Sequence, residues 1–327
     1  MKKVLVILGP TATGKTDISL NLARRFNGEL VSCDSRQVYT GLDIGSGKMP
    51  GKKNRNEEFR IKKGEGFWEI DGIKVWMYDV ADPGIRYTVA DYVEQANKII
   101  EDILQREKLP IIVGGTGLYL KALLEGLSNL NIPMDLKLRK EFEGLNLQEL
   151  QKKLLTLSPA KWDSLNNSEK NNPRRLLRSI ELIYMNPYKR TIDKRQGINN
   201  KYDVLKIGLI VPRKVLNKRI DSRLISRIDQ GLIEEGKKLI CQGLSFERMR
   251  ELGLEYGLLA DLLEGKMTKD QFVEVLKIKI HQFAKRQMTW FRKEKDITWF
   301  DISVVGVYDQ VEKTVSTWYY ETNDATY

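Results

Sequence analysis

The sequence of 327 residues predicts an α/β fold, with a parallel sheet core covered by helices on both faces and a small all-helical insertion domain. Short apolar runs alternate along the chain with longer amphipathic patterns, and this alternation is typical of parallel sheets. A stretch without a strand pattern interrupts the alternation at residues 128–200. The length exceeds that of most single domains and favours one large domain with a smaller one.

The first half of the chain supplies most of the expected sheet. Apolar runs predict strands at residues 4–8, 30–33 and 110–113, and a helix lies between the first two at residues 17–26. Thr88 and Asp91 form a capping-box pattern. They open a helix whose apolar side chains share one face as far as Ile103.

A basic loop and a hairpin are expected as an insertion at about residues 47–78. Residues 47–63 carry seven basic side chains. Beyond them, Asp71 and Gly72 separate two short runs of aromatic and β-branched residues. An Asp-Gly pair between such runs is a strong signal for a two-residue hairpin turn.

The second half divides into three parts. Residues 128–200 are polar, basic and helical in pattern, an apolar run at 204–211 is expected to complete the sheet, and helical patterns follow from 212 to about 295. We therefore assign the core to residues 1–127 and 201–300 and the helical insertion to residues 128–200. Residues 301–327 form a tail in which we find little usable pattern.

Basic residues outnumber acidic ones by 55 to 44, which gives a formal net charge of +11. Such a surplus is typical of a polyanionic partner, and a solubility surface explains it equally well. Cys33, Cys241 and the single histidine, His281, provide neither a zinc site nor a disulfide framework. No run approaches the roughly 18 apolar residues of a membrane span. We expect a cytoplasmic, monomeric protein without a membrane partner.

Residues 9–16, Gly-Pro-Thr-Ala-Thr-Gly-Lys-Thr, match the phosphate-binding loop pattern G-x-x-x-x-G-K-[ST] at every fixed position. A strand precedes the motif and a helix follows it, as a P-loop requires. Backbone amides and the helix N-terminus attract phosphate, Lys15 adds a full charge, and Thr16 is placed to bind Mg²⁺. The core is therefore expected to be P-loop NTPase-like. The motif predicts phosphate binding and does not single out a kinase.

Two further turns are expected at the same edge of the sheet. Asp34 ends the second strand, where its carboxylate can act as a base, bind Mg²⁺ through water or cap a turn. The glycine-rich turn at residues 114–117 brings Thr116 to the same edge. For this second turn, a tight turn without function is equally consistent with the sequence.

Two basic clusters are candidates for nucleic acid contacts. Arg174 and Arg178 are one helical turn apart and share a face, which suits a phosphate backbone. Residues 285–292, Lys-Arg-Gln-Met-Thr-Trp-Phe-Arg, interleave basic and aromatic side chains, a combination that suits nucleic acid. Each cluster alone is also compatible with a solvated helix face.

Together these segments resemble the tRNA dimethylallyltransferase family, bacterial type. The motifs that carry the resemblance occur in the family's order at residues 9–16, 34–45, 114–119, 173–178 and 285–292. The resemblance covers about residues 3–295. It implies transfer of a dimethylallyl group from dimethylallyl diphosphate to the exocyclic amine of the adenosine 3′ of the anticodon in tRNA. It also implies Mg²⁺ as cofactor and a helical insertion that grips the anticodon stem-loop.

The resemblance also implies roles for individual residues, with Asp34 as the base, and with Thr11, Lys15 and Arg223 as further catalytic groups. Thr16 would lie at the metal ion. The diphosphate would be held by Gly9, Thr11, Ala12, Thr13, Gly14, Lys15 and Thr16. The tRNA would be bound by Asp34, Ser35, Arg36, Gln37, Thr116, Arg139, Arg174, Arg175, Leu176, Leu177, Arg178, Lys285 and Arg286.

The chain departs from the family pattern at Glu255, where many members carry a basic residue, and in a basic loop and hairpin that are longer than usual. Three other functions remain open: a P-loop kinase for a nucleotide or metabolite, a prenyltransferase for free adenine nucleotide, and a non-catalytic RNA-binding protein. The helical insertion and the net charge of +11 favour RNA over a free nucleotide. Lys15 and Asp34 favour an enzyme.

Overall fold

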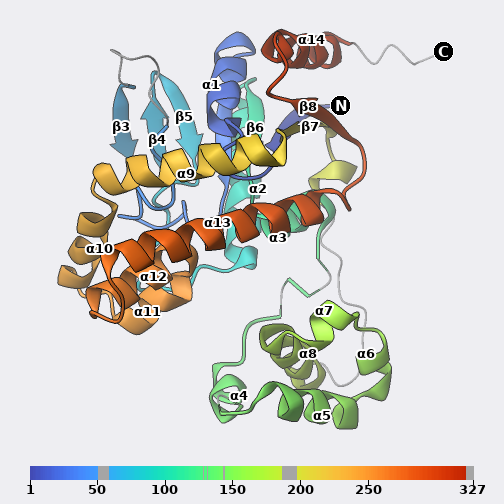
Figure 1. The fold of residues 1–327 in the computed structure, drawn as a ribbon. Coiled ribbons are helices and arrows are strands. Elements are labelled where there is room, and N and C mark those ends of the chain that lie inside the picture. The colour runs from blue at the N-terminus through green and yellow to red at the C-terminus, as the bar shows by residue number, and fades with distance from the viewer. Residues whose placement is uncertain (51–58, 128, 131, 143, 186–196, 322–327) are drawn as a thin grey trace. The chain divides into compact units, whose positions relative to one another are not determined.

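The structure, a computed structural model, describes residues 1–50, 59–127, 129–130, 132–142, 144–185 and 197–321 (Figure 1). The chain forms two compact units, one comprising Met1–Glu125 with Gly197–Tyr327 and the other Gly126–Gln196. The residue bounds of the second unit are close to those predicted for the helical insertion, 128–200. None of the described helices is long and apolar enough to cross a membrane.

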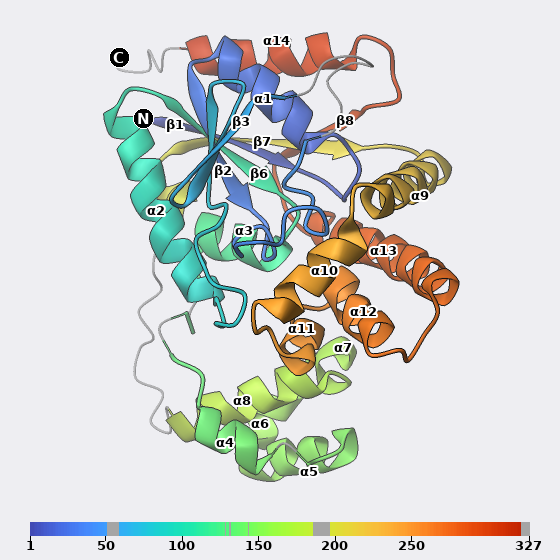
Figure 2. The same cartoon turned by 90° about the vertical axis from the view of Figure 1, so that its left-hand side faces the viewer.

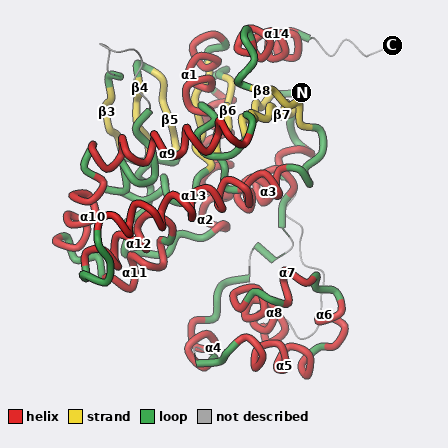
Figure 3. The backbone as a smooth tube through the Cα atoms, in the orientation of Figure 1, coloured by secondary structure: helices red, strands yellow, loops and turns green. Residues whose placement is uncertain are grey.

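An eight-stranded sheet in the order β3-β4-β5-β2-β6-β1-β7-β8 forms the centre of the first unit (Figure 3). Neighbouring strands from β5 to β8 are parallel, whereas β4 is antiparallel to both β3 and β5. The predicted α/β fold is therefore confirmed, with a sheet that is parallel except at β3 and β4. The strands are β1 (Lys3–Leu8), β2 (Gly28–Cys33), β3 (Ile61–Gly64), β4 (Phe67–Ile70), β5 (Ile73–Trp76), β6 (Leu109–Gly114), β7 (Asp203–Ile210) and β8 (Ile297–Asp301).

Helices cover both faces of the sheet, as Figure 2 shows. On one face lie α1 (Lys15–Arg25) and α14 (Val307–Tyr320), and on the other lie α2 (Val89–Gln105) and α3 (Gly117–Glu125). The capping box predicted for α2 is present, since the Thr88 side chain accepts from the Asp91 amide and the Asp91 side chain accepts from the Thr88 amide.

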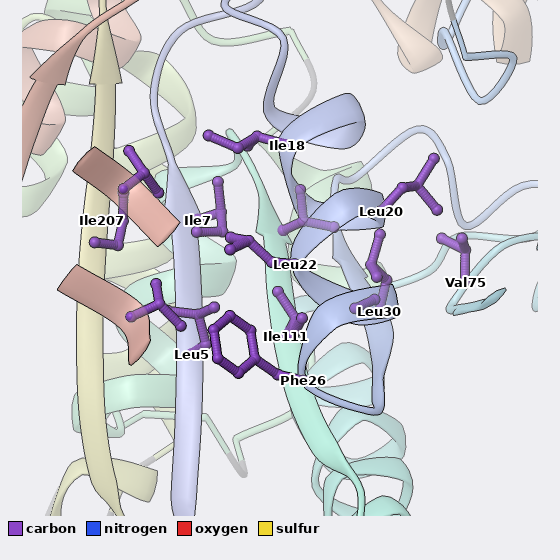
Figure 4. Packing of buried hydrophobic residues seen from close by; sticks show 14 of the residues in the cluster. Leu5, Ile7, Ile18, Leu20, Leu22, Phe26, Leu30, Val75, Ile111 and Ile207 are labelled. Atoms are coloured by element: carbon purple, nitrogen blue, oxygen red, sulfur yellow. The ribbon is translucent and has the colours of Figure 1, made fainter. Parts of the chain in front are cut away.

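Apolar side chains form the core beneath α1 (Figure 4). Leu5, Ile7 and Ile111 project from the central strands toward Leu22 and Phe26 of the α1 segment, and each of these side chains is at most 3% exposed. Burying apolar area of this kind contributes roughly 25 cal/mol per Å². The packing fixes α1, and with it the loop between β1 and α1, against the sheet.

A second apolar cluster joins the remaining helices of the first unit to the segment that follows β2. Its buried members include Val38, Leu42, Tyr256 and Phe272. This packing brings α9 and α13 to the carboxyl edge of the parallel strands, beside the phosphate loop. The helices of this cluster are α9 (Arg213–Asp229), α10 (Leu232–Cys241), α11 (Phe246–Leu252), α12 (Leu254–Leu263) and α13 (Lys269–Phe291). The 3₁₀ turn η1 (Ile198–Asn200) contacts α3 instead.

The described residues of the second unit form helices and connecting loops, without a strand. Its own small core contains Phe142, Leu150, Leu154, Leu176 and Ile180. Asparagine and serine side chains cap three of its helices, as expected at helix N-termini. The helices are α4 (Leu136–Glu141), α5 (Leu147–Leu157), α6 (Pro159–Asp163), α7 (Asn167–Lys170) and α8 (Pro173–Met185).

The predicted hairpin is present as β4 and β5, and it extends the main sheet because β5 pairs with β2. One expectation needs correction. The tail beyond residue 300 is structured. Its helix α14 buries Val307, Val311 and Val315 in the main core, at the four-residue spacing of one helix face.

Lys48, one of the seven basic residues of the predicted loop, has a role that its charge alone does not predict. Its side chain is fully buried, and its ammonium group donates to the Tyr39 carbonyl at 2.6 Å and to Asp43 at 3.0 Å. It also pairs with Asp79, which accepts from the Trp68 ring nitrogen. Residues 51–58 of the predicted loop lie outside the described residues, and its last residues belong to β3.

Candidate active site

The phosphate loop has the geometry of an anion-binding nest. Ala12 and Gly14 adopt positive φ angles of 63° and 75°, and such left-handed residues turn successive backbone amides toward one side. The Pro10 carbonyl accepts hydrogen bonds from the Thr13 hydroxyl at 2.9 Å and the Lys15 ammonium at 2.7 Å. The loop is therefore held in shape from within, at the N-terminus of α1.

A cavity of about 530 Å³ opens beside this loop. It brings together most of the residues predicted for the donor side and the base, together with residues from α9 and α13. The predicted residues that line it are Thr11, Ala12, Gly14, Lys15, Thr16, Asp34, Arg36, Gln37 and Arg223.

The cations of the cavity repel one another. Burial and the Arg223 guanidinium lower the pKa of Lys15 to about 7, and Asp34 partly offsets this effect. The neighbouring Arg227 and burial also lower the pKa of Arg223. A bound anion would stabilise the charged forms of Lys15 and Arg223. The cavity therefore favours a multiply charged anion such as a diphosphate.

Arg223 and Arg227 converge on the backbone at Gly47. A methyl carbon at Gly47 would lie 2.5 Å from Arg223 Nη2 and 2.1 Å from Arg227 Nη2, so a side chain here would displace both guanidinium groups. Arg227 pairs with Glu255 at 3.3 Å, and both side chains are largely buried. The departure from the family pattern at Glu255 thus supplies a counter-charge for Arg227.

The segment after β2 places a carboxylate and an amide in the cavity. Asp34 Oδ1 accepts the Arg36 amide at 2.9 Å, which fixes the carboxylate. The Gln37 side chain is held between the Ser32 hydroxyl at 2.6 Å and the Gly47 carbonyl at 3.3 Å. Sequence reasoning predicted this edge, and the structure places both side chains at the same cavity.

Ser35 and Thr116 connect this segment to the second glycine turn. The Ser35 amide donates to the Thr116 hydroxyl at 3.1 Å, and the Thr116 amide donates to the Cys33 carbonyl at 3.2 Å. Thr116 therefore supports the residue next to Asp34. Neither Ser35 nor Thr116 is among the side chains that line the cavity.

The segment at residues 285–292 contributes an uncharged side chain to the cavity, while its first two basic residues lie on the surface. Lys285 and Arg286 are exposed on α13, and the Arg286 guanidinium lies 5.9 Å from the centre of the Phe283 ring. Gln287 is the residue that enters the site, where it is only 6% exposed. We did not predict Gln287, because nothing in the sequence marks which face of this helix meets the phosphate loop.

In the second unit, the predicted tRNA-binding residues fall into two groups. Arg174 and Arg175 are exposed, and Arg175 lies 3.7 Å from Glu169. Arg178 instead donates to the backbone carbonyls of residues 129, 132 and 133.

Two further predicted tRNA contacts in this unit serve its internal structure. Arg139 pairs with the fully buried Glu181, which also pairs with Arg178. Leu176 is completely buried in the unit's core, so its side chain does not face an RNA, whereas Leu177 is half-buried.

Comparison with known proteins settles the family. A family model described as IPP transferase matches residues 37–294, and one described as isopentenyl transferase matches residues 2–61. The chain belongs to the IPP transferase family. A curated member, the tRNA dimethylallyltransferase of Halalkalibacterium halodurans, is 35% identical over 93% of this chain and 92% of its own. The corresponding protein of Bacillus cereus is 36% identical over 92% and 90%.

Solved structures agree with this membership of the IPP transferase family. The full-length tRNA isopentenylpyrophosphate transferase from Bacillus halodurans matches 97% of this chain and 96% of its own, with a TM-score of 0.67 and 32% identity. A eukaryotic dimethylallyltransferase acting on tRNA matches 99% of this chain and 82% of its own, with a TM-score of 0.72. At 23% identity, the second match shows the shared fold alone.

Proposed function

We propose that this protein transfers a dimethylallyl group from dimethylallyl diphosphate to the exocyclic amine of the adenosine 3′ of the anticodon in tRNA, and releases diphosphate. Membership of the IPP transferase family supports the reaction class. One structural observation carries the proposal further. A single cavity is lined by the phosphate loop, by Asp34 and by Arg223, which are the groups that this reaction needs.

The first requirement is stabilisation of the leaving group. As the bond between the allylic carbon and the diphosphate oxygen breaks, negative charge accumulates on the diphosphate. Lys15, Arg223 and the loop amides are fixed around the place where that charge develops. Preorganised charges of this kind usually contribute the largest part of an enzyme's rate enhancement.

The second requirement is a group that takes a proton from the amine. The adenine amine is a weak nucleophile, because its lone pair is delocalised into the ring. As the carbon–nitrogen bond forms, one amine proton passes to the Asp34 carboxylate. The Arg36 amide occupies Asp34 Oδ1, which leaves the other oxygen to face the acceptor. Such a general base contributes typically 10²–10⁴-fold to the rate.

The third requirement is access to the base. An adenosine in an unpaired loop can leave its stack at a cost of a few kcal/mol, and enzymes that act on bases commonly use this step. Arg36 and Gln37 line the cavity beside Asp34 and are the side chains available to contact the extruded base. We propose that the exposed Arg174 and Arg175 contact the RNA backbone.

Mg²⁺ fits this site as a partner of the diphosphate. The ion takes oxygen ligands and usually keeps several waters while bound to one or two protein groups and to phosphates. The Thr16 hydroxyl lines the cavity and would hold the ion together with diphosphate oxygens, whereas the described residues contain no cluster of three side chains that would bind a metal alone. Bound there, the ion would neutralise diphosphate charge. A chelator is expected to abolish turnover.

The identity of the prenyl acceptor distinguishes this proposal from an enzyme for free nucleotides and from a kinase. The full-length protein is incubated with dimethylallyl diphosphate and Mg²⁺, and with either unmodified tRNA or AMP, and digested nucleosides are examined by mass spectrometry. We expect prenylated adenosine only from tRNA. Product from AMP alone would indicate an enzyme for free nucleotides, and phosphoryl transfer from ATP without prenylation would indicate a kinase.

A further inference from the structure

Gln287 of α13 joins two loops that are separate in the sequence. Its Oε1 atom accepts the Thr11 amide of the phosphate loop at 3.0 Å, and its Nε2 atom donates to the Gly115 carbonyl at 3.0 Å. The side chain is 6% exposed, so both bonds form away from bulk water. Both hydrogen-bonding groups of the amide end are therefore committed to backbone atoms of the site.

The approach of α13 depends on two glycines in the turn after β6. A methyl carbon at Gly115 would lie 2.3 Å from Gln287 Nε2, and one at Gly117 would lie 2.3 Å from the Trp290 ring. Gln287 and Trp290 are three positions apart and share a helix face. The helix is consequently seated against this turn with little freedom to shift.

Hydrogen bonds also connect the glycine turn after β6 to the segment that carries Asp34. Thr116, between the two glycines, accepts the amide of Ser35 at 3.1 Å, and Ser35 follows Asp34 directly. A continuous path of hydrogen bonds and backbone therefore runs from Thr11 through Gln287 and the glycine turn to Asp34.

We propose that Gln287 is a positioning residue that sets the placement of the phosphate loop relative to Asp34. This inference deepens the proposed function and rests on it, because prenyl transfer requires the leaving group and the proton acceptor to be aligned about one allylic carbon. Misplacement of reacting groups by about 1 Å can slow an enzyme about 10²-fold. Gln287 itself touches neither substrate in this role.

The test compares Gln287→Met with the matched control Gln282→Met, which changes an exposed glutamine on the same helix. Methionine fills a similar volume but removes both hydrogen bonds. Binding of inorganic diphosphate with Mg²⁺ is measured by calorimetry on the full chain. We expect Gln287→Met to weaken this binding about tenfold, the order expected when a buried hydrogen-bonded amide is left unpaired. Gln282→Met should match the wild type.

Turnover gives the second readout. Gln287→Met should raise the KM for dimethylallyl diphosphate and lower kcat by about 10–100-fold, while the Kd for tRNA stays within about twofold. Equal weakening of diphosphate and tRNA binding would indicate a general structural role and overturn the proposal, as would wild-type values throughout.

A second variant keeps the test valid if Gln287→Met does not fold. Gly115→Ala retains Gln287 but places a methyl carbon against its amide nitrogen, and it should weaken diphosphate binding in the same direction. Wild-type diphosphate binding by Gly115→Ala would contradict the proposal. Because diphosphate binding is measured without a prenyl acceptor, these results stand even if the protein transfers no prenyl group to tRNA. Such a failure would refute the proposed function separately.

Discussion

Arg223 Nη1 lies 3.5 Å from the hydroxyl oxygen of Thr11, although the two residues are 212 positions apart in the sequence. Helix α9 thereby adds a cation to a phosphate loop that already carries Lys15. The fold brings these charges together before any anion is present, at a cost in stability. This arrangement leads directly to the first prediction.

Replacing Lys15 with methionine is expected to stabilise the ligand-free protein. The pKa of Lys15 is lowered from 10.5 to about 7, so the unfolded chain binds more protons than the folded one between these values. Stability should therefore rise as pH increases from about 7 toward 10.5, and the cost of charging Lys15 is fully present below pH 7. At about pH 6, Lys15→Met should melt several degrees above the wild type.

With diphosphate bound, the wild type should melt at a higher temperature than Lys15→Met. The anion restores a favourable environment for the Lys15 charge, so diphosphate with Mg²⁺ should raise the melting temperature of the wild type much more than that of Lys15→Met. The measurement is thermal unfolding at about pH 6 and pH 9, with and without diphosphate. A ligand-free variant that is less stable than the wild type at pH 6 would contradict this electrostatic account.

Asp34→Asn is expected to lower turnover by about 10²–10⁴-fold, because an amide does not accept the amine proton. The asparagine oxygen can still accept the Arg36 amide, so the local backbone should be retained. Single-turnover rates and tRNA affinity are measured for both proteins. Near-normal turnover would remove Asp34 from the mechanism, and a parallel loss of tRNA affinity would indicate a binding role instead.

The exposed arginines of the helical unit should control the salt dependence of tRNA binding. Each contact with a phosphate releases counterions, so Arg174→Ala and Arg175→Ala should each reduce the slope of log affinity against log salt by about one. Arg178→Ala should instead destabilise the unit, because its guanidinium group holds three backbone carbonyls.

The control for this series is Lys98→Ala, which removes one positive charge from an exposed position on α2. It should leave the salt slope unchanged. Slopes identical to the wild type for Arg174→Ala and Arg175→Ala would show that these arginines form only a solvated face. Lys285 and Arg286 would then be the next candidates for RNA contacts.

Lys48→Met should destabilise the protein by about 3–5 kcal/mol, as expected when one partner of a buried ion pair is removed. The variant leaves Asp43 and Asp79 without their shared cation. Lys62→Met is the matched control, since Lys62 is 83% exposed and its pair with Glu69 is long at 3.8 Å. The control should change stability by less than about 1 kcal/mol. Equal effects in denaturant unfolding would contradict the buried network.

Much of the fold was predictable because local rules agreed with the tertiary structure. Asp71 and Gly72 form the predicted hairpin turn, and both adopt the positive φ angles, 47° and 83°, that this pair favours. The helix α14 was missed, although the spacing of Val307, Val311 and Val315 is typical of a buried helix face. Its polar and aromatic surroundings obscured that pattern.

The site residues that belong to a contiguous sequence motif were predictable. Those that reach the site only through tertiary packing were not. The phosphate loop and Asp34 were found because each follows a strand directly. The burial of Lys48 was not predictable, because burial of a lysine depends on partners far along the chain, such as Asp79. Gln287 was overlooked for the same reason, since its partners lie 172 and 276 residues away.

The most direct test of prenyl transfer to tRNA uses two transcripts of one tRNA that differ only in the nucleotide 3′ of the anticodon, adenosine in one and guanosine in the other. Each is incubated with the protein, dimethylallyl diphosphate and Mg²⁺, and released diphosphate and prenylated nucleoside are quantified together. We predict one diphosphate for each prenylated adenosine in the first transcript, and neither product from the second. Diphosphate release without prenylated adenosine, or equal modification of both transcripts, would contradict the account.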